Sequence, residues 1–210
     1  MTQRVVVATH NAGKLKEIAR IIGEAVEGAD FEFVTSGEMN LPDPVEDGTT
    51  FEANALIKAR DAALRTGLPA LADDSGLIVD VMGMAPGILS ARWSGKHGDD
   101  AANNALLLAQ ISDIPDDART ARFRCAAALI IPANVSADGQ AHEFVEVRDM
   151  EGVLLREERG SHGFGYDPLF VPSEQDGART SAEMSAEEKN AISHRGKALR
   201  AIAQYFQQLA

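Results

Sequence analysis

A succession of short apolar runs and amphipathic helical segments limits the fold of this chain more than any other feature of its sequence. Residues 4–8 form the first apolar run, and a helical pattern follows with Leu15, Ile18 and Ile22 on one face. The other expected strands and helices lie at 77–81, 99–111, 123–131, 143–148 and after Ser193. Because strands and helices interleave without strict alternation, we predict an α/β fold with a central mixed sheet and helices on both faces.

Length and composition indicate one domain. With 210 residues, 45% of them hydrophobic, the chain can bury a core, and no repeat or linker divides it, so we expect residues 1–210 to form a single domain. The apolar run 125–131 is too short to cross a membrane, and the first residues lack the apolar stretch of a signal peptide. We therefore expect a cytoplasmic location with no membrane partner, and a buried structural thiol at Cys125.

The charge balance limits the partners. The formal net charge is −12, from 32 acidic and 20 basic residues. Such a surface repels a phosphate backbone, so we expect no nucleic-acid partner. A small anionic ligand remains compatible, since a few lysines can set the local field.

The pattern Thr9-x-Asn11-x-x-Lys14 lies between the first expected strand and the first expected helix. A helix start offers backbone N–H groups and a partial positive charge to a phosphate, and Gly13 allows close approach. The spacing is not that of a P-loop. The simpler interpretation is that Asn11 caps the helix and Lys14 is solvated.

Carboxylates follow two other expected elements. Asp73 and Asp74 open a polar turn expected at 73–76, and adjacent carboxylates at a strand end point to opposite sides. Glu46 lies just before a helix that Thr49 and Glu52 are expected to start as a capping box. Carboxylates can bind Mg²⁺, although acidic turns are common without it. Further along this helix, Lys58 is either a ligand for an anion or a solvated lysine.

A third group of residues has side chains that could bind a flat heterocycle. Its members are Phe164, Gly165, Tyr166, Asp167, Lys189, His194 and Arg195. An aromatic ring can stack on a base, a carboxylate can accept from a ring N–H, and Arg or His can donate to a keto oxygen. A His-Arg pair at a helix start is otherwise an ordinary surface cap.

Taken together, these segments resemble the inosine triphosphate pyrophosphatase family, whose members hydrolyse deaminated purine nucleotides. The matching segments occur in the family's order over nearly the whole chain: Thr9-x-Asn11-x-x-Lys14, Gly48-x-Thr50-Phe51-x-x-Asn54-Ala55, Ala72-Asp73-Asp74-Ser75-Gly76-Leu77, Gly87-x-x-Ser90-Ala91-Arg92, Gly163-Phe164-Gly165-Tyr166-Asp167-Pro168 and Ile192-Ser193-His194-Arg195-Gly196.

The resemblance implies a central mixed twisted sheet with flanking helices, two lobes around a deep cleft, and a homodimer. It also implies Mg²⁺-dependent hydrolysis of inosine and xanthosine triphosphates to the monophosphate and pyrophosphate. Asp74 and Lys14 would be catalytic, with Glu46 and Asp74 as metal ligands. The implied substrate-binding residues are Thr9, His10, Asn11, Ala12, Gly13, Lys14, Lys58, Ser75, Phe164, Gly165, Tyr166, Asp167, Lys189, His194 and Arg195.

Two points stay open at the level of sequence. Many relatives carry Glu-Glu-Thr-Gly where this chain has Val45-Glu46-Asp47-Gly48, so Asp47 competes with Glu46 as the second metal ligand. The alternative functions are a regulatory module that binds a purine triphosphate without hydrolysing it, and a pyrophosphatase of broader specificity.

Overall fold

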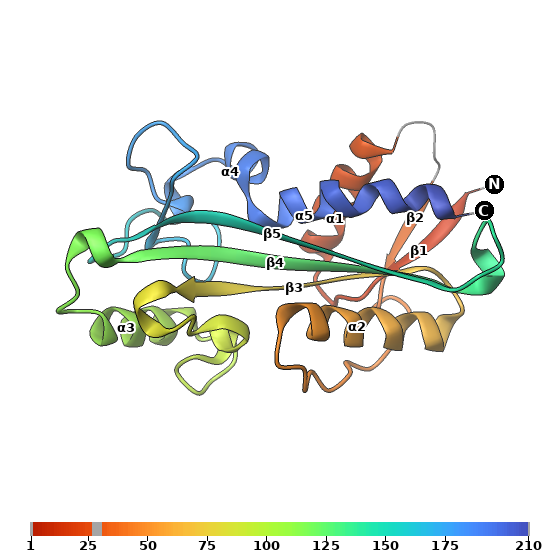
Figure 1. The fold of residues 1–210 in the computed structure, drawn as a ribbon, viewed down its shortest axis with the longest axis horizontal. Coiled ribbons are helices and arrows are strands. Elements are labelled where there is room, and N and C mark those ends of the chain that lie inside the picture. The colour runs from red at the N-terminus through yellow and green to blue at the C-terminus, as the bar shows by residue number, and fades with distance from the viewer. Residues whose placement is uncertain (1, 27–30, 210) are drawn as a thin grey trace. The chain divides into compact units, whose positions relative to one another are not determined.

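The strands form one mixed sheet. The structure, a computed structural model, describes residues 2–26 and 31–209. The strand order is β2-β1-β3-β4-β5-β6 (Figure 1), with β1 parallel to β2 and β3, and β5 antiparallel to β6. The strands are β1 Gln3–Val7, β2 Phe31–Thr35, β3 Ala70–Val79, β4 Thr120–Ile131, β5 His142–Leu154 and β6 Phe170–Pro172. The predicted mixed α/β sheet is confirmed.

Five α-helices accompany the strands in the described residues. They are α1 Ala12–Ala25, α2 Phe51–Thr66, α3 Asp100–Gln110, α4 Ala186–Ile192 and α5 His194–Ala203. The α2 helix starts one residue later than predicted, since Thr50 and not Thr49 accepts a hydrogen bond from the Ala53 N–H. It ends at Gly67, whose φ of 69° is left-handed and therefore suits a glycine. Helix α4 begins with a capping box formed by Ser185 and Glu188.

The chain divides into two compact units. Unit 1 comprises residues 1–74, 125–148 and 195–210, and unit 2 comprises residues 75–124 and 149–194. Strands β3, β4 and β5 each contribute residues to both units. The expectation of a single domain therefore remains a prediction.

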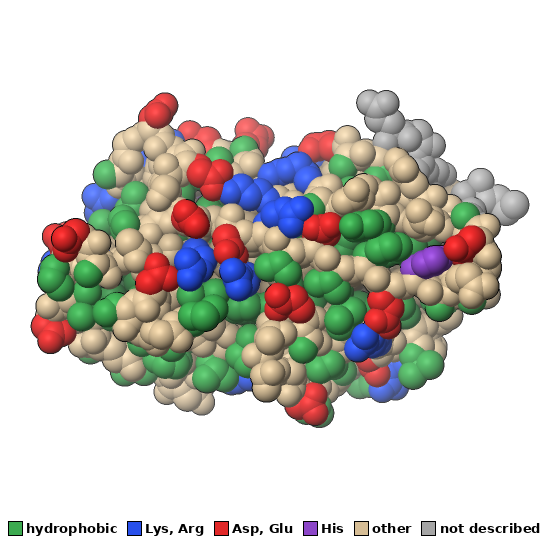
Figure 2. All heavy atoms as spheres, in the orientation of Figure 1, with side chains coloured by type: hydrophobic (Ala, Val, Ile, Leu, Met, Phe, Trp, Pro, Cys, Tyr) green, Lys and Arg blue, Asp and Glu red, His purple; other side chains and the backbone are tan. Residues whose placement is uncertain are grey.

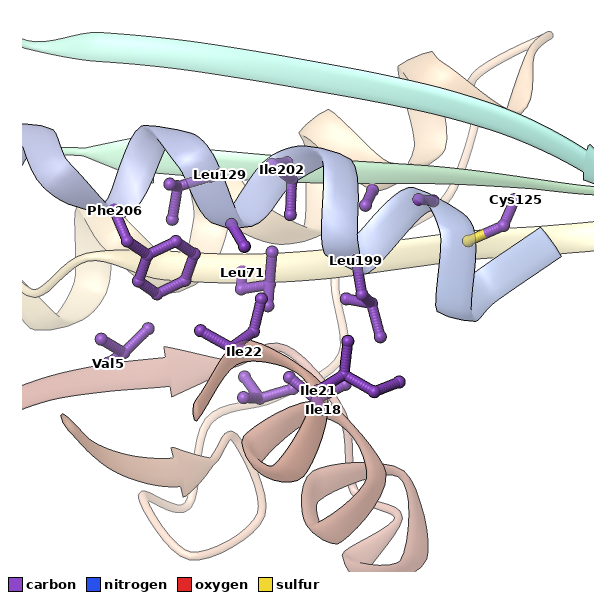
Figure 3. Close-up of a cluster of buried hydrophobic side chains, with 14 of the residues drawn as sticks. Val5, Ile18, Ile21, Ile22, Leu71, Cys125, Leu129, Leu199, Ile202 and Phe206 are labelled. Atoms are coloured by element: carbon purple, nitrogen blue, oxygen red, sulfur yellow. The ribbon is translucent and has the colours of Figure 1, made fainter. Parts of the chain in front are cut away.

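Strand β4 contributes to the core of unit 1, and its residues 125–131 are all buried. In β4, Cys125, Leu129 and Ile131 point to the same side and are fully buried. They pack with Ile22 of α1 and Ile202 of α5 in one apolar cluster (Figure 3). Helix α2 lies on the other face of these strands (Figure 1). Cys125 is therefore part of the core, as predicted.

Unit 2 has a separate core. Leu77 and Val79 of β3, Leu107 of α3 and Phe170 of β6 are fully buried in one cluster. The buried Arg119 lies beside this core and donates to three backbone carbonyls, among them that of Ile111 at the end of α3. A buried guanidinium thus closes the end of a helix.

Strand β3 differs from the prediction in one respect that matters for the site. The sequence suggested a polar turn at 73–76, but β3 runs without interruption from Ala70 to Val79. Asp73 and Asp74 are compatible with a strand here because each carboxylate has cationic partners on its own face of the sheet. Both carboxylates therefore belong to a rigid element.

The described surface mixes charges of both signs. On the face drawn in Figure 2, Lys and Arg side chains lie among Asp and Glu side chains. Arg124 pairs with Asp149 at 2.7 Å, and Arg60 pairs with Glu143 at 2.6 Å. Within residues 2–26 and 31–209, no helix has the length and hydrophobicity needed to cross a membrane.

Candidate active site

The start of α1 is organised by two side chains of the predicted phosphate segment. Asn11 caps the helix and accepts hydrogen bonds from the N–H groups of Gly13 (2.8 Å) and Lys14 (3.2 Å). Thr9 accepts one from the Asn11 N–H at 3.1 Å. Asn11 thus caps the helix, as the simpler interpretation of the sequence had it. Lys14 is not merely solvated, because its ammonium contacts Asp73.

His10 connects this segment with the acidic loop. Its Nε2 lies 3.0 Å from Asp43, and its ring packs against Gly37. This contact joins the segment before α1 to the loop that carries Glu46, although both side chains are largely exposed. Ala12 is the first residue of α1.

Asp73 lies on the face of β3 that carries the buried Leu71. Lys14 Nζ is 3.3 and 3.4 Å from its two oxygens, and Arg195 Nε of α5 is 3.1 Å from Oδ2. Burial alone would raise the pKa of Asp73, but Lys14, Arg195 and Lys58 together lower it far below its ordinary value. Asp73 is therefore a buried, ionised carboxylate.

Asp74 faces the opposite side of β3, towards α2. Lys58 donates to Oδ1 at 3.0 Å and the Asn54 amide to Oδ2 at 3.3 Å. Burial raises the pKa of Asp74, while Lys58 works against this shift. A carboxylate in such surroundings accepts a proton more readily than an exposed one.

Glu46 and Asp74 share the same cation. Lys58 Nζ is 3.2 Å from Glu46 and 3.0 Å from Asp74, so the two carboxylates are close enough to hold one ion. Asn54 Oδ1, a buried oxygen beside them, has no hydrogen-bond donor. Oxygen ligands of this kind fit Mg²⁺, which takes one or two carboxylates and completes its shell with water and phosphate. Among the residues the structure describes, no cluster of three or more His, Cys, Asp or Glu side chains occurs that could hold a metal. Glu46 and the competing Asp47 are both exposed, and Glu46 is the one that contacts Lys58.

In unit 2, an exposed aromatic ring is held beside a lysine. The Phe164 side chain is 62% exposed, and Lys189 Nζ lies 5.1 Å from its ring centroid. Lys189 and the Phe164 N–H both donate to Oδ2 of the buried Asp167, at 2.5 and 2.9 Å. Gly163 has a φ of 80° and lies so close to Asp167 that no side chain would fit. The result is an exposed aromatic ring with a cation over one of its faces.

The rest of this segment is anchored by hydrogen bonds. Tyr166 is buried and donates to the Ser90 carbonyl at 2.9 Å, and the Gly165 N–H donates to Asp100 at 2.7 Å. Ser90 in turn accepts from the Leu77 N–H at 2.9 Å. The Gly87-x-x-Ser90 segment is thus structural support for Tyr166.

His194 and Ser75 complete the predicted set in unit 2. His194 is buried and stacks on Phe123, with ring centroids 5.1 Å apart. Ser75 follows Asp74 in β3 and is half-buried. Their roles towards a substrate remain predictions.

The placement of Arg195 was not evident from the sequence. It is buried in unit 1, where its Nε contacts Asp73 and its Nη1 lies 3.8 Å from Glu17. Asp73, Glu17 and Asn54 were not on the predicted list of site residues, and no local pattern marks a partner 122 positions away. Unit 1 thus holds predicted site residues in two groups: Lys14 and Arg195 contact Asp73, while Glu46 and Asp74 contact Lys58 on the other face of β3.

Comparison with known proteins assigns the family. The Ham1 family matches residues 5–205 of this chain. The chain belongs to the Ham1 family. A dITP/XTP pyrophosphatase from Bifidobacterium longum subsp. infantis is 57% identical over 242 residues, covering 95% of this chain and 96% of the relative.

Solved structures agree with this Ham1 assignment. A HAM1 protein from Coxiella burnetii superposes with a TM-score of 0.84 at 39% identity, over 98% of this chain and 99% of its own. A nucleoside-triphosphatase / dITP/XTP pyrophosphatase from Mycobacterium abscessus gives a TM-score of 0.76 at 48% identity, over 95% and 97%. The predicted family and fold are therefore both confirmed.

Proposed function

We propose that this Ham1-family protein hydrolyses inosine, deoxyinosine and xanthosine triphosphates to the monophosphate and pyrophosphate, which keeps deaminated purines out of the nucleotide pool. The observation that carries the proposal is its 57% identity, over nearly the whole chain, to a dITP/XTP pyrophosphatase. Water attacks the α-phosphorus, the bond to the bridging oxygen breaks, and pyrophosphate leaves with that oxygen.

The residues of unit 1 act on the phosphates. Lys14, 30% exposed at the start of α1, offers its ammonium to the charge that develops during the attack. Asp74 orients the water and takes its proton, and burial suits it to this task by raising its pKa. Lys58, which contacts Asp74 in this structure, assists in binding the triphosphate.

Glu46 and Asp74 would hold Mg²⁺, as their shared contact with one ammonium supports. When bound, the ion offsets negative charge on the phosphate oxygens. A homodimer and a cytoplasmic location, where nucleotides are consumed, belong to the same proposal and are supported by the family resemblance.

In unit 2, the exposed ring of Phe164 offers a stacking surface to the purine, and the neighbouring Lys189 offers N–H donors. Hypoxanthine and xanthine carry an acceptor oxygen at position 6, whereas adenine carries a donor there. Two opposed donors leave a buried group unpaired, which costs about 1–3 kcal/mol. That corresponds to roughly ten- to hundredfold discrimination. His194, which belongs to the same unit, stays a candidate donor for this oxygen.

A substrate panel tests the proposal. Purified protein with Mg²⁺ is given inosine, xanthosine, adenosine, guanosine and cytidine triphosphates, and pyrophosphate release is measured. We expect fast release only from the first two. Binding without release would instead identify a regulatory module, and similar rates for cytidine would identify a broad pyrophosphatase.

The role of Asp74 has its own test. Asp74→Asn keeps the shape of the side chain but removes the proton acceptor, so turnover should fall by at least about 10³-fold with the fold intact. Asp80→Asn, which alters a surface ion pair with Arg122, is the matched control and should keep normal rates. Near-normal turnover in Asp74→Asn would remove this residue from the mechanism.

A further inference from the structure

Asp73 has no role in the chemistry described above, yet it is among the most buried charged groups of unit 1, with 6% of its surface exposed. We propose that Asp73 is a positioning residue, whose carboxylate fixes the ammonium of Lys14, with Arg195 as its second counter-charge. This inference rests on the proposed function, because Lys14 acts on the phosphates there.

The geometry of the Lys14 contact supports a tether. Lys14 Nζ lies almost equally far from both oxygens of Asp73, at 3.3 and 3.4 Å. A lysine has a flexible four-carbon stem, so its ammonium needs a fixed partner to stay in one place. Asp73 is such a partner because it belongs to β3, in the core of the unit. The Lys14 side chain as a whole remains 30% exposed.

Arg195 explains why a carboxylate is stable at this position. Its Nε donates to Asp73 Oδ2 at 3.1 Å, and its own side chain is 8% exposed. If a lysine that also binds substrate were the single partner of a buried carboxylate, the carboxylate would lose its counter-charge whenever that lysine moved. The guanidinium gives Asp73 a second counter-charge beside Lys14.

The position of Asp73 in β3 separates its task from that of Asp74. Adjacent residues of a strand point to opposite faces. Asp73 therefore meets Lys14 of α1 and Arg195 of α5, while Asp74 meets Lys58 and Asn54 of α2. One carboxylate fixes a cation, and its neighbour is left for the reaction.

A double-mutant cycle between Asp73 and Lys14 tests the tether. The variants Asp73→Asn, Lys14→Gln and the combination are assayed for kcat and KM with inosine triphosphate. A displacement of a catalytic group by about 1 Å can cost on the order of 100-fold in rate, so we expect Asp73→Asn to lower kcat by about that factor. KM should not rise, because a negative charge near a polyanionic substrate has been removed.

The decisive comparison is the effect of Asp73→Asn when Lys14 is already absent. A tether predicts a change of less than about threefold in the Lys14→Gln background, since there is no ammonium left to position. An equal loss of kcat in both backgrounds would mean that Asp73 only supports the fold, and would overturn the proposal. Asp149→Asn, which breaks an Asp–Arg pair in unit 2, is the control and should leave kcat unchanged.

A second substitution covers the case in which Asp73→Asn does not fold. Asp73→Glu keeps the buried charge but shifts the carboxylate by one methylene, so it should lower kcat by about tenfold and again only when Lys14 is present. If the wild-type protein itself releases no pyrophosphate, the proposed function has failed. The same cycle is then measured on the affinity for inorganic triphosphate, where additive effects of the two substitutions would refute the tether.

Discussion

At the scale of single residues, Gly48 has little space for a side chain. A Cβ built there would lie 2.5 Å from Asn54 Oδ1 and 2.8 Å from Ala53 Cβ. Both atoms belong to the first turns of α2, and Asn54 donates to Asp74. We therefore expect Gly48→Ala to cost about 1–3 kcal/mol of unfolding free energy, and to lower kcat because the contact with Asp74 is disturbed. Thermal unfolding and pyrophosphate release measure the two effects.

Gly23 provides the matched control. It lies within α1, and no heavy atom would come within 4 Å of a Cβ placed there. Gly23→Ala should stabilise the protein by about 0.5–1 kcal/mol, because glycine is a poor helix former. A loss of stability in Gly23→Ala, or no loss in Gly48→Ala, would show that the space around these glycines does not determine whether they tolerate substitution.

The residues of the site could be predicted from the sequence only where chemistry and local spacing agree. Asn11 as a helix cap and the opposite orientation of Asp73 and Asp74 follow from helix and strand geometry, and both are found. The pairing of Asp73 with Arg195 could not be predicted, because it joins residues 122 positions apart. Such a contact depends on how β3 and α5 pack.

At the scale of secondary-structure elements, the connection between β4 and β5 should respond to acid. Asp138 accepts from Ser136 at 2.8 Å and from the Gln140 N–H at 2.9 Å, and His142 Nε2 lies 2.9 Å away. The contact with His142, followed by those with Gln140 and Ser136, lowers the pKa of Asp138 from 3.8 to about 2. A lowered pKa stabilises the folded state at pH values above the ordinary pKa of the group.

This stabilisation should be full above pH 4 and should fade as the pH drops towards 2. The melting temperature of the wild type should exceed that of Asp138→Asn at pH 5, and the difference should shrink by pH 3. Ser136→Ala, which removes one of the three contacts, should show a smaller effect of the same sign. A difference that stays constant between pH 5 and pH 3 would contradict the assigned pKa.

Secondary-structure elements could be predicted where the periodic pattern of apolar residues extends over many positions. Helices α1, α3 and α5 lie close to their expected positions, since their buried side chains recur at helical spacing. The strand β3 was missed at 73–76 because two aspartates and a glycine are typical of turns. Ion pairs from α1, α2 and α5 override that local preference. The start of α2 was misplaced by one residue because Thr49 and Thr50 offer equivalent caps.

At the scale of the whole molecule, we expect the two units to unfold together. Strands β3, β4 and β5 each supply residues to both units, so disorder in one unit would leave each of these strands ordered over only part of its length. Ile202 is fully buried in the core of unit 1, and Ile202→Ala should cost about 2–5 kcal/mol. Trp93, the single tryptophan of the sequence, lies in unit 2 and reports on that unit by fluorescence.

Cooperative unfolding predicts that Ile202→Ala lowers the midpoint seen by Trp93 as much as the midpoint seen by far-ultraviolet circular dichroism. Leu107→Ala in the core of unit 2 is the reciprocal variant and should shift the same single transition. If Trp93 reported an unchanged midpoint in Ile202→Ala, unit 2 would be stable without unit 1, and the continuity of the three strands would not couple them. The shared strands would then serve only to connect two independently folding halves.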